Sequence, residues 1–121
     1  MQRLLIDLHL GVWLALMVMV AVILVSAFPA ALGGRQPPAL YVPLHRAAAG
    51  LIGLQVVIGA LLFATGRRSE TLLHLVYAAA ALATMPVARA LARRSQGNAR
   101  WYQLGGTLLL LGLLLRLFGT G

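Results

Sequence analysis

The stretch that decides the fold is LLIDLHLGVWLALMVMVAVILVSAF, residues 4–28, which is apolar almost throughout. A helix that crosses the hydrocarbon core of a bilayer needs about 20 consecutive, mainly apolar residues. The run is also longer than the apolar core of a secretory signal peptide. We therefore expect a membrane-spanning helix at about residues 4–28.

Three further apolar runs follow this first one. They predict helices at about residues 44–64, 71–91 and 102–118. The Pro- and Gly-rich segment 29–43 does not favour a helix and is expected to form the first loop. The sequence thus predicts an all-α polytopic membrane protein, a bundle of four transmembrane helices forming a single domain over residues 1–121.

Composition excludes an ordinary soluble domain, in which roughly a quarter of the residues are charged. Here 61% of the 121 residues are hydrophobic and 10% are charged. The net charge of +8 comes from arginines at the ends of the apolar runs, with no basic stripe, so we expect the lipid bilayer as partner and no nucleic acid. The lack of cysteine excludes disulfides, iron–sulfur clusters and thiolate zinc sites.

The arginines also predict an orientation, because cytoplasmic loops of membrane proteins carry an excess of positive charge. One side of the predicted bundle carries Arg35, Arg46, Arg89, Arg93, Arg94 and Arg100. The other side carries Arg3, Arg67, Arg68 and Arg116. We expect a multi-pass protein of the cell's inner (plasma) membrane with both termini outside the cytoplasm.

Two histidines are the candidate site. His9 and His74 lie near the starts of the first and third helices, which begin on the same side of the membrane. Two imidazoles at similar depth can act as the axial ligands of one haem iron, so both are candidate metal ligands. A histidine that is merely interfacial is the alternative.

Small residues such as Gly11 and Gly59 could leave room for a haem, although ordinary helix packing uses the same residues. The four arginines on the histidine side could hold the haem propionates, or they could reach to lipid headgroups instead. The candidate cofactor-binding residues are His9, His74, Arg3, Arg67, Arg68 and Arg116.

Two other polar residues lie outside this candidate site. His45 opens the second helix on the opposite side, where we interpret it as interfacial or as part of a quinone or partner-subunit contact. Gln55, near mid-membrane, is expected to make an interhelical hydrogen bond.

The segment from Gly53 to Gly66, followed by Leu73-His74-Leu75, resembles the third and fourth helices of haem A synthases. Those enzymes consist of two similar four-helix halves, each with a histidine pair near the outer surface. The resemblance implies a half-size relative in which His9 and His74 form the pair, with Gln55 and Gly59 on the intervening helix.

The sequence departs from that family at one functional position. The family has a glutamate three residues before its first histidine, whereas Ile6 stands there in this chain and the nearest acid is Asp7. The pair His45-Arg46 resembles one that opens a ligand helix in the family, but here it lies on the helix without a matching partner. This departure puts methyl-group oxidation in doubt, and a haem-dependent oxidoreductase similar to haem A synthase stays open only as the less favoured alternative to a protein without enzyme activity. A two-haem arrangement would need a homodimer.

Two functions remain open on the sequence. One is a membrane-embedded b-type haem protein with bis-histidine ligation, for electron transfer or haem handling, and with no catalytic residue that we can identify. The other is a non-haem structural or assembly subunit of a larger respiratory or photosynthetic complex, with lipid or quinone as ligand.

Overall fold

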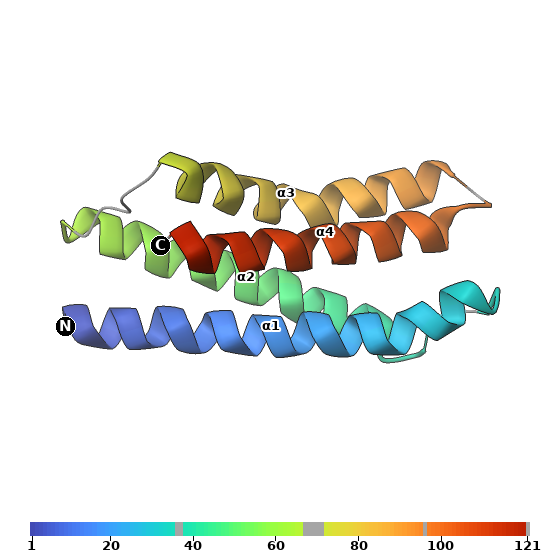
Figure 1. The fold of residues 1–121 in the computed structure, drawn as a ribbon, viewed down its shortest axis with the longest axis horizontal. Helices are drawn as coiled ribbons and strands as arrows, with labels where there is room; N and C mark the ends of the chain where they lie inside the picture. Colours follow the sequence, from blue (N-terminus) through green and yellow to red (C-terminus); the bar gives the residue numbers. More distant parts are fainter. Residues whose placement is uncertain (36–37, 67–71, 96, 121) are drawn as a thin grey trace.

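The structure is a computed structural model whose described part consists of four α-helices (Figure 1). The described residues are 1–35, 38–66, 72–95 and 97–120. The helices are α1 (Gln2–Leu32), α2 (Tyr41–Ala64), α3 (Leu72–Arg94) and α4 (Ala99–Thr120). Each is long and apolar enough to cross a membrane. The predicted all-α fold with four membrane-capable helices is confirmed, and the chain is a multi-pass membrane protein.

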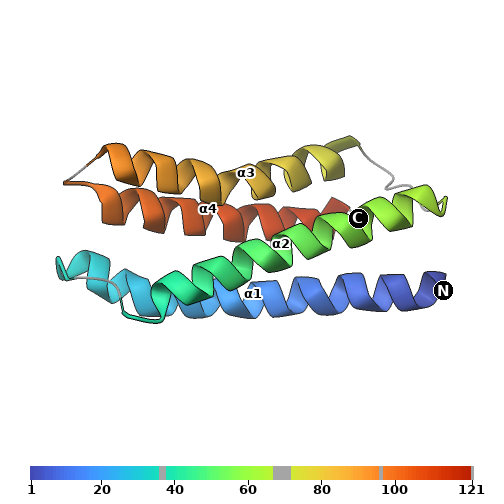
Figure 2. The ribbon, with the colours of Figure 1, turned by 180° about the vertical axis from the view of Figure 1, so that it is seen from behind.

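The first loop is shorter than predicted, because two prolines lie inside helices. Pro29 is within α1, where its missing N–H removes one backbone hydrogen bond without ending the helix. The last part of α1 turns away from the axis of the rest (Figure 1 and Figure 2), which is the bend that an internal proline produces. Pro43 lies in the first turn of α2, where N–H groups have no acceptor within the helix. The prediction of a loop over 29–43 is therefore wrong at both ends.

Gly34 terminates α1. Its φ of 66° is in the left-handed region that favours glycine. The N–H groups of Gly34 and Arg35 donate to the carbonyl oxygens of Ala31 and Ala30, at 3.4 and 2.9 Å. This Schellman arrangement satisfies carbonyl groups that the end of a helix would otherwise leave unpaired.

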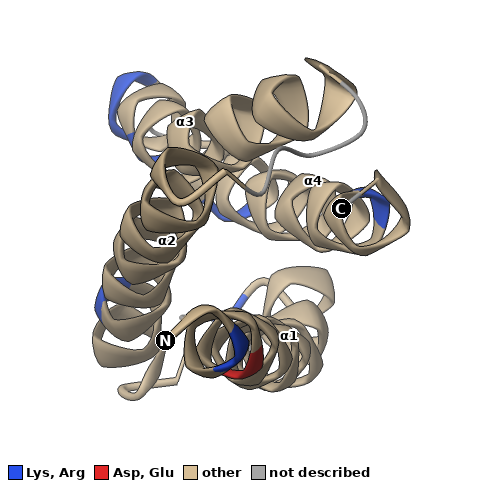
Figure 3. Ribbon diagram, turned by 90° about the vertical axis from the view of Figure 1, so that its left-hand side faces the viewer, with Lys and Arg blue, Asp and Glu red and all other residues tan. Residues whose placement is uncertain are grey.

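The four helices run alternately up and down, so α1 and α3 are parallel. Within the described chain, α1 packs against α2 and α4, while α3 packs against α4 and, over fewer residues, against α2. The end-on view shows α1 and α3 at opposite corners of the bundle (Figure 3). The starts of α1 and α3 and the ends of α2 and α4 therefore share one end of the molecule (Figure 1).

A narrow apolar core joins the helices. Its fully buried side chains include Leu16 and Ile23 of α1 and Leu110 and Leu114 of α4. Large apolar side chains are exposed along all four helices, as expected where lipid tails cover the outer surface. Trp13 adds a polar contact to this packing, since its Nε1–H donates to the carbonyl oxygen of Leu114 at 3.0 Å.

The closest approach of α3 to α4 depends on one glycine. A Cβ atom built on Gly106 would overlap the Cβ atom of Ala88. At the neighbouring Gly105, an added Cβ would meet no atom within 4 Å in the described chain. Small residues at such a crossing allow two helix backbones to approach, which stabilises helix pairs in membranes.

Gly106→Ala is therefore expected to destabilise the protein by about 1–3 kcal/mol relative to Gly105→Ala, because it overpacks the crossing with Ala88. Both substitutions bring the same gain in helix propensity, so Gly105→Ala is the matched control. The midpoint of thermal unfolding in a mild detergent measures the difference. Equal midpoints for the two variants would contradict the close packing at Gly106.

Candidate functional site

His9 and His74 lie at the same end of the bundle. His9 is in the second turn of α1 and His74 in the first turn of α3, and both side chains are half-buried. At this end α1 begins farther out than α3 (Figure 1). Within the described residues the backbones of α1 and α3, which are parallel and diagonal, make no direct contact. The structure thus places both predicted histidines at one end of the bundle.

His9 is held against α2 by two contacts. The side-chain amide of Gln55 donates to the carbonyl oxygen of His9 at 3.0 Å, the interhelical bond predicted for this glutamine. A Cβ atom on Gly59 would lie 3.7 Å from Cε1 of His9, so the imidazole packs over the glycine. Two buried atoms here, Nδ1 of His9 and Oε1 of Gln55, make no hydrogen bond within the described chain. The fold therefore leaves part of the polar capacity of this site unused.

His74 is held by the end of α4. Its Nδ1 atom lies 3.4 Å from the hydroxyl oxygen of Thr120, and the carbonyl oxygen of Leu117 also lies near the ring. The Thr120 hydroxyl donates to backbone carbonyl oxygens of α4, so its oxygen can accept from an Nδ1–H group. With the proton on Nδ1, the lone pair of Nε2 is free for a metal ion, as in most histidine ligands whose other nitrogen is hydrogen-bonded.

An aromatic pair lies deeper in the bundle at the same end. Trp13, one turn after His9 on α1, stacks on Phe118 of α4 with ring centroids 4.7 Å apart and an interplanar angle of 24°. The Trp13 hydrogen bond to Leu114 fixes the indole. Sequence reasoning identified neither contact, because each joins two helices whose relative rotation the sequence does not reveal.

The arginines predicted to bind the haem propionates are less well placed for the candidate site than the two histidines. Arg3 and Arg116 are exposed at the histidine end. Arg67 and Arg68 lie outside the described residues. The two described arginines could reach the carboxylates of a ligand at the membrane surface, but the structure does not bring them into the histidine cluster.

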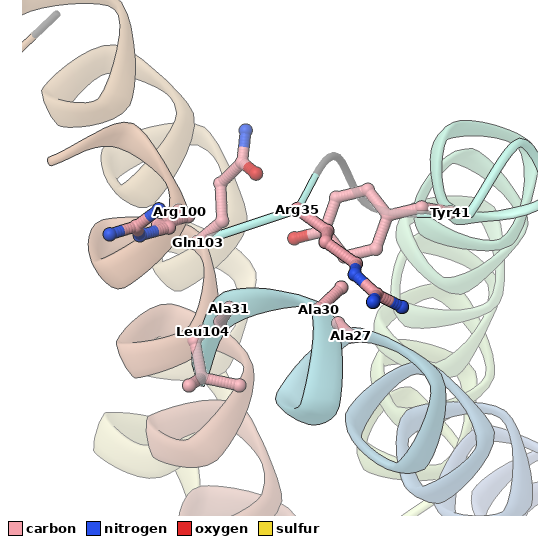
Figure 4. Close-up of a pocket in the computed structure, with 8 residues that line it drawn as sticks. All are labelled: Ala27, Ala30, Ala31, Arg35, Tyr41, Arg100, Gln103 and Leu104. Atoms are coloured by element: carbon pink, nitrogen blue, oxygen red, sulfur yellow. The ribbon is translucent and has the colours of Figure 1, made fainter. Parts of the chain in front are cut away.

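The opposite end holds polar residues that the sequence did not single out as a group. His45 is buried, and its ring contacts that of Tyr41 with centroids 4.1 Å apart. Arg89 of α3 and Gln103 of α4 line a cavity with His45. A second cavity is lined by Tyr41, Gln103 and residues at the end of α1 (Figure 4). The spacing of Tyr41 and His45, one turn apart, is the signal that could have shown them to share a face.

Within the described residues, no cluster of three or more His, Cys, Asp or Glu side chains could hold a bare metal ion. A haem needs only two axial ligands from the protein, because the macrocycle supplies the other four. The two cavities lie at the His45 end, away from the histidine pair.

Comparisons with known proteins give no relative. No family model matches the chain, and neither curated proteins nor solved structures give a match. A function for this chain must therefore be inferred from the polar residues at the two ends of the bundle.

Proposed function

We propose that the chain is a membrane-embedded b-type haem protein in which His9 and His74 are the axial ligands. The observation that supports this most is that both histidines lie at one end of the bundle, on helices that are parallel and diagonal to each other (Figure 1 and Figure 3). An iron bound between two imidazoles needs one ligand on each face of a planar macrocycle. Two histidines that approach from opposite corners of a bundle are suited to that geometry.

The surroundings of each histidine agree with the proposal. Thr120 and the backbone of Leu117 hold the His74 ring from α4, as outer contacts commonly orient a ligand histidine. Gly59 presents no side chain against the His9 ring, and Nδ1 of His9 is not used in holding the fold together. Arg3 and Arg116 would bind the propionates from the membrane surface. Arg67 and Arg68 would add to them on the same side.

The chemistry we propose is one-electron transfer or haem handling, which a haem with two histidine ligands supports when bound. Oxidation of a haem methyl group, as in haem A synthases, is not proposed, because Ile6 takes the place of the glutamate in that family. A quinone or a larger respiratory complex is the partner class that we propose, and a homodimer would give two haem sites.

A non-haem assembly subunit is the second candidate. Two observations favour it: the large apolar surface on all four helices, and the position of both cavities away from the histidine pair. Such a subunit would occupy the same membrane and pack its helices against those of a larger complex.

Absorption spectra of the purified protein test the proposal. After expression with haem available, the parent is expected to show a Soret band, and His9→Ala and His74→Ala are each expected to lose it because one axial bond is removed. His45→Gln is the matched control, since it removes a histidine from the other end and should keep the band. A parent without bound haem, or two alanine variants with the parent's spectrum, would refute the proposal and favour the assembly subunit.

We also propose that both termini lie outside the cytoplasm, from the distribution of arginines. Cysteine labelling tests this without background, because the natural chain has no cysteine. In intact cells, an impermeant maleimide should label Thr65→Cys at the end of α2. It should label Ser95→Cys, after α3, only once the membrane is permeabilised. The reverse pattern would overturn the orientation.

A further inference from the structure

Two buried polar atoms at the end opposite the histidine pair have no hydrogen-bond partner in the described structure. They are Nε2 of His45 and the hydroxyl oxygen of Tyr41. Their residues are only 8% and 6% exposed. Buried polar groups without a partner destabilise a fold, so their arrangement indicates that something else pairs with them.

Both residues face cavities. His45 lines one together with Met85, Ala88, Arg89 and Gln103, with a volume of about 280 Å³ including its open mouth. The other cavity measures about 250 Å³ on the same basis. Figure 4 shows the Tyr41 ring extending from α2 toward the α4 side of that second cavity. Gln103 lines both cavities, so the two adjoin.

The Thr107 hydroxyl lies beside Tyr41 and donates its proton to the carbonyl oxygen of Gln103 at 2.8 Å. The Tyr41 hydroxyl makes no hydrogen bond of standard geometry within the described chain. A ligand oxygen could therefore accept the Tyr41 proton.

The charge around the cavities is positive. Arg89 lines the His45 cavity, and Arg35 and Arg100 line the second cavity. Part of this charge serves the fold, since Nη1 of Arg100 lies beside Gly34 at the end of α1. The only acids of the chain do not balance it. Asp7 is near the start of α1, and Glu70 follows α2 in the sequence.

These features favour a small anion over a quinone ring. A neutral ring would leave the arginine charge uncompensated. A phosphate group offers several acceptor oxygens, matching a guanidinium, an imidazole N–H, a phenol and an amide.

We propose that the cavities formed by Tyr41, His45, Arg89 and Gln103 bind one anionic phosphate group, either as the headgroup of an anionic phospholipid or as free inorganic phosphate. The site is independent of the histidine pair and of haem. It would fix the positions of α2, α3 and α4 at this end of the bundle.

The test is thermal unfolding of the full chain in dodecyl maltoside, followed by tryptophan fluorescence. Dioleoylphosphatidylglycerol is titrated into one sample, and dioleoylglycerol, which has the same acyl chains without phosphate, into another. Inorganic phosphate alone forms a third arm. A rise in the unfolding midpoint with the phospholipid only identifies a lipid headgroup, and an equal rise with inorganic phosphate identifies the free anion. No rise with either phosphate, or an equal rise with dioleoylglycerol, overturns the proposal.

Three variants distinguish a specific phosphate site in the cavities from unspecific attraction of surface arginines to anionic lipid. Arg89→Gln is expected to weaken the phosphate effect at least about tenfold, through loss of a charge-assisted hydrogen bond. Tyr41→Phe should weaken it by between about two- and tenfold with no change in net charge. Arg93→Gln is the matched control: it removes the same charge from an exposed position on α3 outside the cavities, and it should behave like the parent.

Equal weakening by Arg89→Gln and Arg93→Gln, with no effect of Tyr41→Phe, would overturn the proposal in favour of unspecific surface charge. The haem spectrum of each variant should match that of the parent. Failure of the phosphate site therefore leaves the proposed haem site untouched, and failure of the haem site leaves the phosphate proposal in place.

Discussion

In a bilayer, every polar atom must find its partner inside the protein or in a ligand, because lipid tails offer none. This constraint explains the helices, in which the backbone N–H and C=O groups bond to one another. It also divides the buried polar side chains into those that bond to the backbone and those that have no partner in the described chain. In the middle of the bundle, the Thr84 and Thr107 hydroxyls donate to backbone carbonyl oxygens one turn earlier on their own helices. The unpaired buried side-chain atoms of the described chain belong to His9, Gln55, Tyr41 and His45. They lie on α1 and α2, in the two groups that we assign to ligands.

Helix α2 connects the two groups. It carries Tyr41 and His45 at its start and Gln55 and Gly59 farther along, where they contact His9. At 1.5 Å rise per residue, His45 and Gln55 are separated by about 15 Å along the helix. The apolar core, with Ile52 of α2 packed among buried leucines, separates the two groups.

Much of the fold could be predicted from the sequence, because the length of an apolar run is enough to identify a membrane-spanning helix. Counting the spans was enough to predict that His9 and His74 share one end, since the first and third helices of a bundle with short loops begin on the same side. The predicted loop was too long because Pro29 and Pro43 both lie inside helices. Pro29 is accommodated within α1, although proline usually ends a helix. Pro43 is in the first turn of α2, where a backbone N–H has no acceptor within the helix. The cluster around His45 was missed for a different reason. A helix that is apolar on nearly every side gives no periodic signal of which face points inward, so the meeting of His45 with Arg89 and Gln103 appears only in three dimensions.

We propose that His9 and His74 bind the same iron atom. Low-temperature electron paramagnetic resonance of the oxidised, haem-loaded protein is the sharpest test, because the signal reports the axial ligands. We expect a low-spin signal typical of two imidazoles in the parent and in His45→Gln. Both His9→Ala and His74→Ala should lose that signal or convert it to a high-spin signal. A high-spin parent, or a low-spin signal that survives unchanged in either alanine variant, would show that the two histidines do not share an iron.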